Sequence, residues 1–182
     1  MTKAVLSAIG EDAPGIVSAV TGILLRHHAS IEDSTMTILE GHFAMIMIVS
    51  WPTSSNLTRL QTQFHVVEKK FQLITSIREF SIQPRIGSET HKGTPYIVSV
   101  FGSDKPGIVH HVSKFLASQK ISITDLNSKV IGKEGGKNVY ALVMEIETPL
   151  TQSISKLKNF LKKIERRLKV EIKIKPLESF TL

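Results

Sequence analysis

Gly10-Glu11-Asp12-Ala13-Pro14-Gly15-Ile16-Val17 is the stretch that decides the fold, because it returns as Gly102-Ser103-Asp104-Lys105-Pro106-Gly107-Ile108-Val109, 92 positions later. Each copy follows a β-branched and aliphatic run that is typical of a strand, and each precedes an apolar pattern with helical spacing. The repeated turn therefore predicts a strand that ends at a glycine and a helix that begins soon after it, once in each half of the chain.

The residues of the turn suit the start of a helix. Asp12 and Asp104 are expected to accept hydrogen bonds from the first free backbone N–H groups, and Pro14 and Pro106 stand near the first helical position. A helix N-terminus beside a glycine also offers oriented N–H donors and the positive end of the dipole to a carboxylate or phosphate. A strand-to-helix turn without a ligand explains the same residues, so both interpretations stay open.

Length and composition bound the architecture. With 182 residues and an internal repeat, we predict two domains, at 1–85 and 95–182, joined by a polar linker at 86–94. No apolar run approaches the roughly 20 residues that a membrane span needs, and no secretory leader follows Met1. The chain has no Cys, which excludes disulfides and thiolate chemistry and fits a cytoplasmic protein.

Hydrophobic periodicity predicts the element order βαββαβ in both halves. In the first half the expected strands are 4–9, 30–39, 43–49 and 73–82, with one helix over about 14–28 and a second that starts at 52–56. In the second half the expected strands are 96–101, 121–130, 139–146 and 168–175, with helices over 107–119 and 152–167. Such a unit is an α+β, ferredoxin-like fold, an antiparallel four-stranded sheet with both helices on one face. We expect the other half or a partner chain to cover the open face.

The two halves differ in length at one place. Residues up to Asp125 match at a shift of 92, whereas Phe43-Ala44 aligns with Tyr140-Ala141 at a shift of 97. The five additional residues therefore lie in the second hairpin, around 131–138, where we expect a surface loop.

The net charge of +7 is concentrated in the second half. Residues 1–85 carry seven Lys/Arg and seven Asp/Glu, whereas residues 95–182 carry fifteen and eight. Nine of these cations cluster on the last helix and strand: Lys156, Lys158, Lys162, Lys163, Arg166, Arg167, Lys169, Lys173 and Lys175. This cluster suits nucleic acid or an acidic partner, and a solvated helix face is the alternative.

Catalytic and metal-binding motifs are not found in the sequence. It contains no nucleophile elbow, phosphate-binding loop, dinucleotide fingerprint or zinc-protease motif. The adjacent pairs His27-His28 and His110-His111 cannot chelate one ion unaided, because helical neighbours point about 100° apart. We therefore expect a protein that is not an enzyme and that uses no metal and no cofactor.

The element order, the doubled Asp-x-Pro-Gly-Ile-Val turn and Ser30-Ile31-Glu32-Asp33-Ser34 resemble tandem ACT-domain proteins, in particular the family of glycine cleavage system transcriptional repressors. The resemblance implies that an amino acid binds between two domains, held by the strand-to-helix turn and by the start of the second strand of the same or a neighbouring domain. Carried over, these ligand-binding residues are Asp12, Gly15, Ile16, Ser30 and Ile31, with Asp104, Gly107, Ile108, Ser122 and Ile123. Many family members have Asn where Ser30 and Ser122 stand, and an amide offers donors and an acceptor that a hydroxyl does not match.

The leading hypothesis is a regulatory protein, a homodimer, that senses a small amino acid such as glycine and changes its contact with a transcription activator. One alternative is direct nucleic-acid binding by the basic C-terminal helix. Another is a detached ACT regulatory subunit of an amino-acid biosynthetic enzyme. No membrane partner is expected.

Overall fold

The computed structural model describes residues 2–51, 57–80, 93–151 and 153–177. The chain divides into two compact units, Met1–Pro84 and Arg85–Leu182. The predicted linker lies outside the described residues as far as residue 92, and the second unit's first strand begins at Gly93.

Each unit has the predicted order βαββαβ. The first unit consists of β1 (Thr2–Glu11), α1 (Ile16–Arg26), β2 (Ser30–Leu39), β3 (His42–Trp51), α2 (Leu57–Phe71) and β4 (Ile74–Phe80). The second consists of β5 (Gly93–Ser103), α3 (Ile108–Ser118), β6 (Ser122–Glu134), β7 (Lys137–Pro149), α4 (Ile154–Leu168) and β8 (Val170–Pro176). The residues that the sequence analysis proposed to start the second helix, 52–56, lie outside the described part of the chain.

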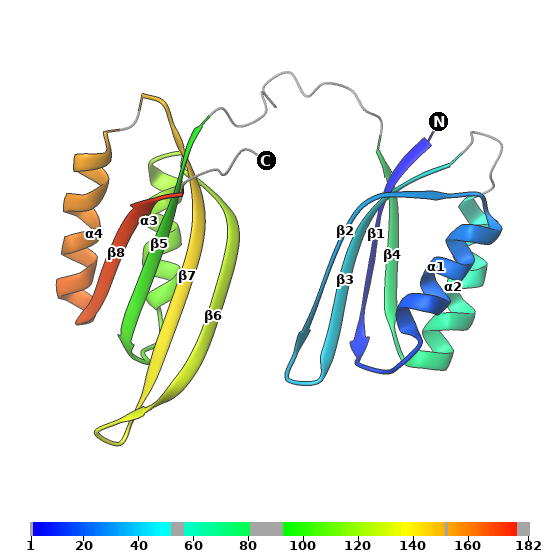
Figure 1. Ribbon diagram of the computed structural model, residues 1–182, viewed down its shortest axis with the longest axis horizontal. Coiled ribbons are helices and arrows are strands. Elements are labelled where there is room, and N and C mark those ends of the chain that lie inside the picture. The colour runs from blue at the N-terminus through cyan, green and yellow to red at the C-terminus, as the bar shows by residue number, and fades with distance from the viewer. Residues whose placement is uncertain (1, 52–56, 81–92, 152, 178–182) are drawn as a thin grey trace. The chain divides into compact units, whose positions relative to one another are not determined.

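The sheets confirm the predicted fold class. Their strand orders are β2-β3-β1-β4 and β6-β7-β5-β8, and all the pairings are antiparallel. In each unit both helices lie on the same face of the sheet (Figure 1). Strand β3, which has an unbroken apolar run, is a central strand, and β2 is an edge strand.

Alternation along β3 shows how the core forms. Phe43, Met45 and Met47 are buried toward the helices, whereas Ile46 on the opposite face is 45% exposed. Helix α1 buries Ile16, Val20, Ile23 and Leu24 as one stripe. The second unit has a separate core of the same construction. Within the first unit, the face of the sheet opposite the helices therefore carries exposed apolar side chains.

The second hairpin differs from the loop that we expected. Strand β6 continues to Glu134 and β7 begins at Lys137, so only Gly135 and Gly136 form the turn, both at positive φ (55° and 78°). Four of the five additional residues make two further strand pairs, and Ile131 is a bulge between the pairs Val130↔Tyr140 and Gly132↔Val139. The bulge absorbs the odd residue, because an unbulged insertion of odd length would move every later side chain to the opposite face.

Candidate functional site

The two strand-to-helix turns have almost the same backbone conformation. Gly15 (φ 98°, ψ −6°) and Gly107 (φ 94°, ψ −2°) are the N-cap residues of α1 and α3, both in the left-handed region. This conformation is readily available to glycine and costly for residues with a Cβ atom, which explains the glycine in both copies. The helices begin directly after these glycines, at Ile16 and Ile108.

The expectation that Asp12 and Asp104 cap the helices is wrong. Within the described part of the chain neither helix has a side-chain cap hydrogen bond, and each aspartate precedes the first helical residue by four positions. A capping side chain must stand at the N-cap position, which the glycine occupies. Both aspartate side chains are instead exposed.

The backbone of each aspartate anchors the turn to the neighbouring hairpin. The Asp12 N–H donates to the Gly41 carbonyl at 2.8 Å, and the Asp104 N–H donates to the Asn138 carbonyl at 2.8 Å. These bonds extend the β1–β3 and β5–β7 ladders by one step, so the turn is held at a fixed place beside the hairpin.

Uncapped helix starts leave backbone donors available. In α1 the first regular helical bond joins the Ala19 N–H to the Gly15 carbonyl at 2.9 Å, so the N–H groups of Val17 and Ser18 precede it. In α3 the corresponding bond runs from His111 to Gly107, also at 2.9 Å. Within the described residues no side chain caps these donors, and they lie at the positive end of the helix dipole.

Ile16 and Ile108, two of the predicted ligand residues, belong to the core. Their exposed fractions are 1% and 3%. Any contact that they make with a ligand therefore uses the backbone and not the side chain. Gly15 and Gly107 are exposed at the surface, where another group can approach the backbone.

The predicted residues at the start of the second strand lie at the opposite end of the sheet. Ser30 pairs with Ser50, which pairs with Lys3 near the beginning of β1, whereas the turn follows Glu11 at the end of β1. The eight residues between these two levels of β1 span about 26 Å at 3.3 Å per residue. Neither unit therefore brings its own turn and its own strand start together, since the second unit has the same pairing.

The strand starts of the two units differ in chemistry. Both carry a β-bulge, at Glu32 and at Thr124, where the pairing register shifts by one residue. Glu32 forms an ion pair with Lys3, and the hydrogen bond from Lys3, together with one from Ser50, lowers the pKa of its carboxyl. Thr124 provides no carboxylate at the matching position.

Exposure separates the two strand starts as well. Ser30 and Ile31 are exposed, whereas Ser122 and Ile123 are half-buried and Ile123 packs against the core of its unit. The two copies of the predicted site therefore offer different surfaces.

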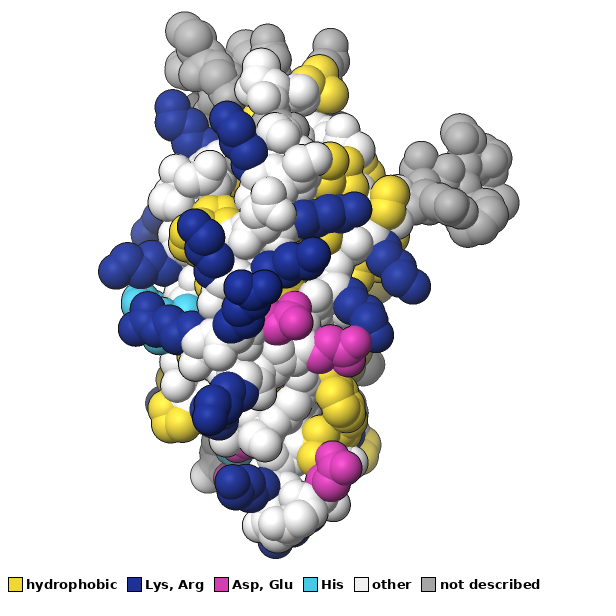
Figure 2. Space-filling model, turned by 90° about the vertical axis from the view of Figure 1, so that its left-hand side faces the viewer, with side chains coloured by type: hydrophobic (Ala, Val, Ile, Leu, Met, Phe, Trp, Pro, Cys, Tyr) yellow, Lys and Arg dark blue, Asp and Glu magenta, His cyan; other side chains and the backbone are white. Residues whose placement is uncertain are grey.

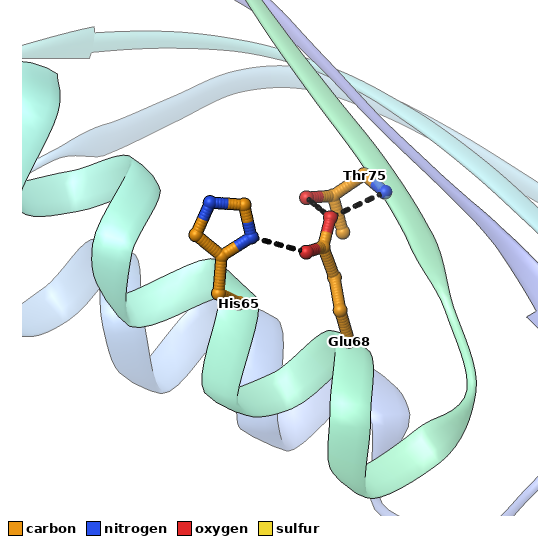
Figure 3. Close-up of polar contacts among 3 residues, drawn as sticks. All are labelled: His65, Glu68 and Thr75. Atoms are coloured by element: carbon orange, nitrogen blue, oxygen red, sulfur yellow. Dashed lines mark hydrogen bonds and ion pairs between the residues drawn. The ribbon is translucent and has the colours of Figure 1, made fainter.

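A hydrogen-bonded carboxylate that sequence reasoning missed, that of Glu68, lies between α2 and β4 (Figure 3). Glu68 accepts hydrogen bonds from the Thr75 N–H at 3.0 Å and the Thr75 hydroxyl at 2.7 Å, and His65 Nδ1 lies 2.6 Å from its second oxygen. Burial alone raises the pKa of this carboxyl, but the bonds from Thr75 and His65 outweigh it and leave the pKa lowered.

The same contact is present in the second unit. Glu165 on α4 accepts a hydrogen bond from the Ile172 N–H at 3.3 Å, and Glu165 stands 97 positions after Glu68, the shift that aligns the second halves of the repeats. A search for matched carboxylates at that shift would have found the pair.

The described residues contain no group of three or more His, Cys, Asp or Glu side chains placed to hold a metal ion. Among the helices of the described ranges, none has the length and apolarity that a membrane span needs.

Comparison with known proteins agrees with this architecture. The ACT domain family matches residues 2–78 and 94–175. A UPF0237 protein of Methanopyrus kandleri is 49% identical over 49 residues, which cover 27% of this chain and 54% of that protein. The chain thus spans about half the length of the first relatives that it matches.

Two solved structures match nearly the whole chain. One is an unknown protein from Galdieria sulphuraria, with a TM-score of 0.77 and 24% identity over 97% of this chain and 99% of that one. The other is named as a "putative glycine cleavage system transcriptional repressor", with a TM-score of 0.68 and 21% identity over 98% of both chains. At these identities the likeness shows a shared fold. Because the family match covers most of both units, this chain belongs to the ACT-domain family, with one ACT domain in each half.

Proposed function

We propose that this protein is a non-enzymatic, cytoplasmic regulator that senses a small amino acid, with glycine as the first candidate, and changes its contact with a transcription activator. The observation that carries the proposal is the doubled helix N-terminus at Gly15 and Gly107, which is uncapped by side chains in both ACT domains. The solved structure named for glycine cleavage repression supports the regulatory part.

The chemistry of the turn suits a zwitterion. The backbone N–H groups at the start of α1 and the positive helix end favour the carboxylate of an amino acid. The exposed side chain of Asp12, which is not used as a cap, offers a negative charge to the ammonium group. Asp104 and α3 repeat the arrangement.

A second ACT domain completes each site under this proposal. Ser30 and Ile31, or Ser122 and Ile123, lie about 26 Å along the strand from the turn of their own unit, beyond the reach of one small ligand. A strand start that contacts the bound amino acid therefore comes from another ACT domain. We propose that a second copy of the chain supplies it and that the protein works as a homodimer.

The test is a melting experiment with a panel of amino acids. A ligand that binds only the folded state raises the Tm, by about 2.7 kcal/mol of stability when present at one hundred times its Kd. Acetate and methylamine, each with one charge of glycine, should bind at least about tenfold more weakly, because each loses a charge-assisted contact of roughly 1.5–3 kcal/mol.

Variants locate the site. Asp12→Asn and Asp104→Asn, made singly and together, should weaken amino-acid binding by about tenfold or more in calorimetry. The control Glu79→Gln removes an exposed carboxylate from β4 and should leave binding unchanged. A wild-type protein that binds no amino acid, or a double variant that binds as tightly as the wild type, would refute the sensing proposal.

A further inference from the structure

The solvent-facing side of α4 and the edge strand β8 form a strongly basic surface. We call it the α4–β8 basic surface: the nine Lys and Arg residues between Lys156 and Lys175, all of them exposed. Figure 2 shows Lys and Arg side chains spread over this face of the protein, with few Asp or Glu side chains among them. A groove of about 380 Å³ runs between the helix and the strand, lined by Lys158 and Lys162 from α4 and by Lys173 and Lys175 from β8.

Internal carboxylates do not neutralise this surface. Between the start of α4 and the end of β8 there are two acidic residues, Glu165 and Glu171. Glu165 accepts the Ile172 N–H at 3.3 Å, and Glu171 pairs with Lys173 at 2.7 Å. No salt bridge among the described residues involves Lys158 or Lys162.

The first unit shows that the fold does not require the two lysines that α4 contributes to the groove. Helices α2 and α4 have the same length, and their matched residues Glu68 and Glu165 make the same bond to the edge strand. At the shift of 97 positions, Gln61 stands where Lys158 stands and His65 where Lys162 stands. The same backbone thus occurs with and without the lysines, so their role lies outside folding.

The edge of β8 is protected against an added peptide strand. The outward N–H of Ile172 is already bound by Glu165, Pro176 has no N–H, and Lys173 and Lys175 add charge at the edge. An extended acidic peptide would therefore find few free donors with which to pair.

The apolar residues of α4 do not suit a protein or membrane partner. Its apolar stripe, Leu157, Leu161, Ile164 and Leu168, is buried in the core at 9% exposure or less. Phe160 is the one large apolar side chain of α4 that is exposed, and it stacks on Phe115 with the ring centroids 3.6 Å apart. A stable protein interface needs apolar anchors, and a membrane-surface helix needs an apolar face of its own.

We propose that the α4–β8 basic surface binds the phosphate backbone of double-stranded nucleic acid without reading its sequence. A helix of this length extends about 22 Å, a distance over which a duplex carries about 13 phosphates. Lys158 and Lys162 are one helical turn apart, about 6 Å, and together with the cations of β8 they present charge on both sides of the groove. This activity is separate from the proposed amino-acid sensing.

The test measures the binding of the full chain to a fluorescent 20-base-pair duplex of random sequence, in DNA and RNA forms, from 50 to 300 mM NaCl and without amino acids. The logarithm of the affinity should fall linearly with the logarithm of the salt concentration, by about 0.9 for each phosphate contact. The groove variant, Lys158→Gln with Lys162→Gln and Lys175→Gln, removes three lysines that line the groove. It should reduce that slope by about 3 and weaken binding at 50 mM at least about 30-fold.

A matched control distinguishes the effect of the α4–β8 basic surface on binding from the effect of net charge. The variant Lys129→Gln, Lys133→Gln, Lys137→Gln removes three exposed lysines from the β6–β7 hairpin and should change the affinity by less than about threefold. If the groove variant melts at a lower temperature than the wild type, Lys158→Gln with Lys162→His, which installs the residues of the first unit, replaces it.

Three outcomes would overturn the proposal. They are no binding to either duplex at 50 mM NaCl, an equal loss of affinity in the groove and hairpin variants, and tighter binding to poly-glutamate of the same charge number. The third outcome would assign the surface to an acidic protein. Because no amino acid is present, failure here leaves the sensing proposal untouched.

Discussion

The outward N–H of Thr75, on edge strand β4, is bound at 3.0 Å by the carboxylate of Glu68 on α2. An edge strand has unpaired backbone donors on one side, and a buried donor without a partner costs about 1–3 kcal/mol. Glu165 does the same for Ile172 in the second unit. One side chain in each unit thus holds the second helix against the edge of its sheet.

Glu68→Gln should lower the free energy of unfolding by about 1–2 kcal/mol at pH 7, because the amide loses the charge-assisted bonds from Thr75 and His65. The pKa of Glu68 is lowered in the folded state, so its contribution is complete above the ordinary pKa that the carboxyl has in the unfolded chain. It disappears as the pH falls through the lower folded value. Urea unfolding from pH 7 to pH 3 measures this.

The control is Glu79→Gln, the exposed carboxylate of β4, which should change stability by less than about 0.5 kcal/mol. If Glu68→Gln lowers the free energy of unfolding by the same amount at pH 3 as at pH 7, the shape of the side chain, and not the carboxylate charge, holds the helix.

At the scale of elements, both hairpins close with a two-residue turn, although their strands differ in length. The first turn is Glu40-Gly41 and the second is Gly135-Gly136, and all four residues have positive φ, as two-residue turns that match the strand twist require. The second hairpin adds two strand pairs and the bulge at Ile131. All the residues from Ile131 to Asn138 are exposed, so the extension adds no core.

Removal of Ile131, Gly132, Lys133, Lys137 and Asn138 should convert the second hairpin into the form of the first. Glu134 would then pair with Val139 around the Gly135-Gly136 turn, and the Gly136 carbonyl would take the Asp104 N–H, as Gly41 takes that of Asp12. We expect the free energy of unfolding to change by less than about 1 kcal/mol in urea titration. The comparison is a deletion of the same five residues together with Tyr140, which is half-buried against the core. This larger deletion should destabilise the protein.

A large loss of stability in the five-residue deletion would mean that the tip of the hairpin carries contacts beyond its own strands.

At the scale of the whole molecule, each unit has a complete sheet and its own buried core. The first core contains Leu6, Phe43 and Phe64, and the second contains Val98, Leu142 and Leu157. Among the described residues, neither cluster contains a residue of the other unit. A domain with its own core has what it needs to fold independently, even near the lower end of domain size.

The fragments 1–84 and 85–182 should each unfold cooperatively, with a stability of roughly 4–15 kcal/mol at 0.05–0.15 kcal/mol per residue. Trp51, the one tryptophan of the chain, is 2% exposed and reports on the first unit alone by fluorescence. Circular dichroism follows the second fragment. A fragment that keeps its helices but lacks fixed aromatic signals would contradict the independence of the cores.

Local sequence patterns were sufficient to predict the helices and strands, because these elements depend on side-chain periodicity. The doubled turn and the hydrophobic periodicity predicted the element order βαββαβ in both halves, and the structure confirms it. The positions of Asp12 and Asp104 were misjudged, because the sequence does not show that a glycine at positive φ takes the N-cap position. The spare residue in the second hairpin became a bulge for a reason that only strand pairing reveals.

The amino-acid sequence by itself determined the two-fold repeat, the fold class and the basic character of α4 and β8, since each follows from residue types at regular spacing. Tertiary structure alone decided that the turn and the strand start of one unit lie at opposite ends of a sheet, and that Glu68 and Glu165 bind the edge strands. The reason is physical: spacing along a chain fixes which face a side chain occupies, whereas distance between segments is fixed only when strands pair and helices pack.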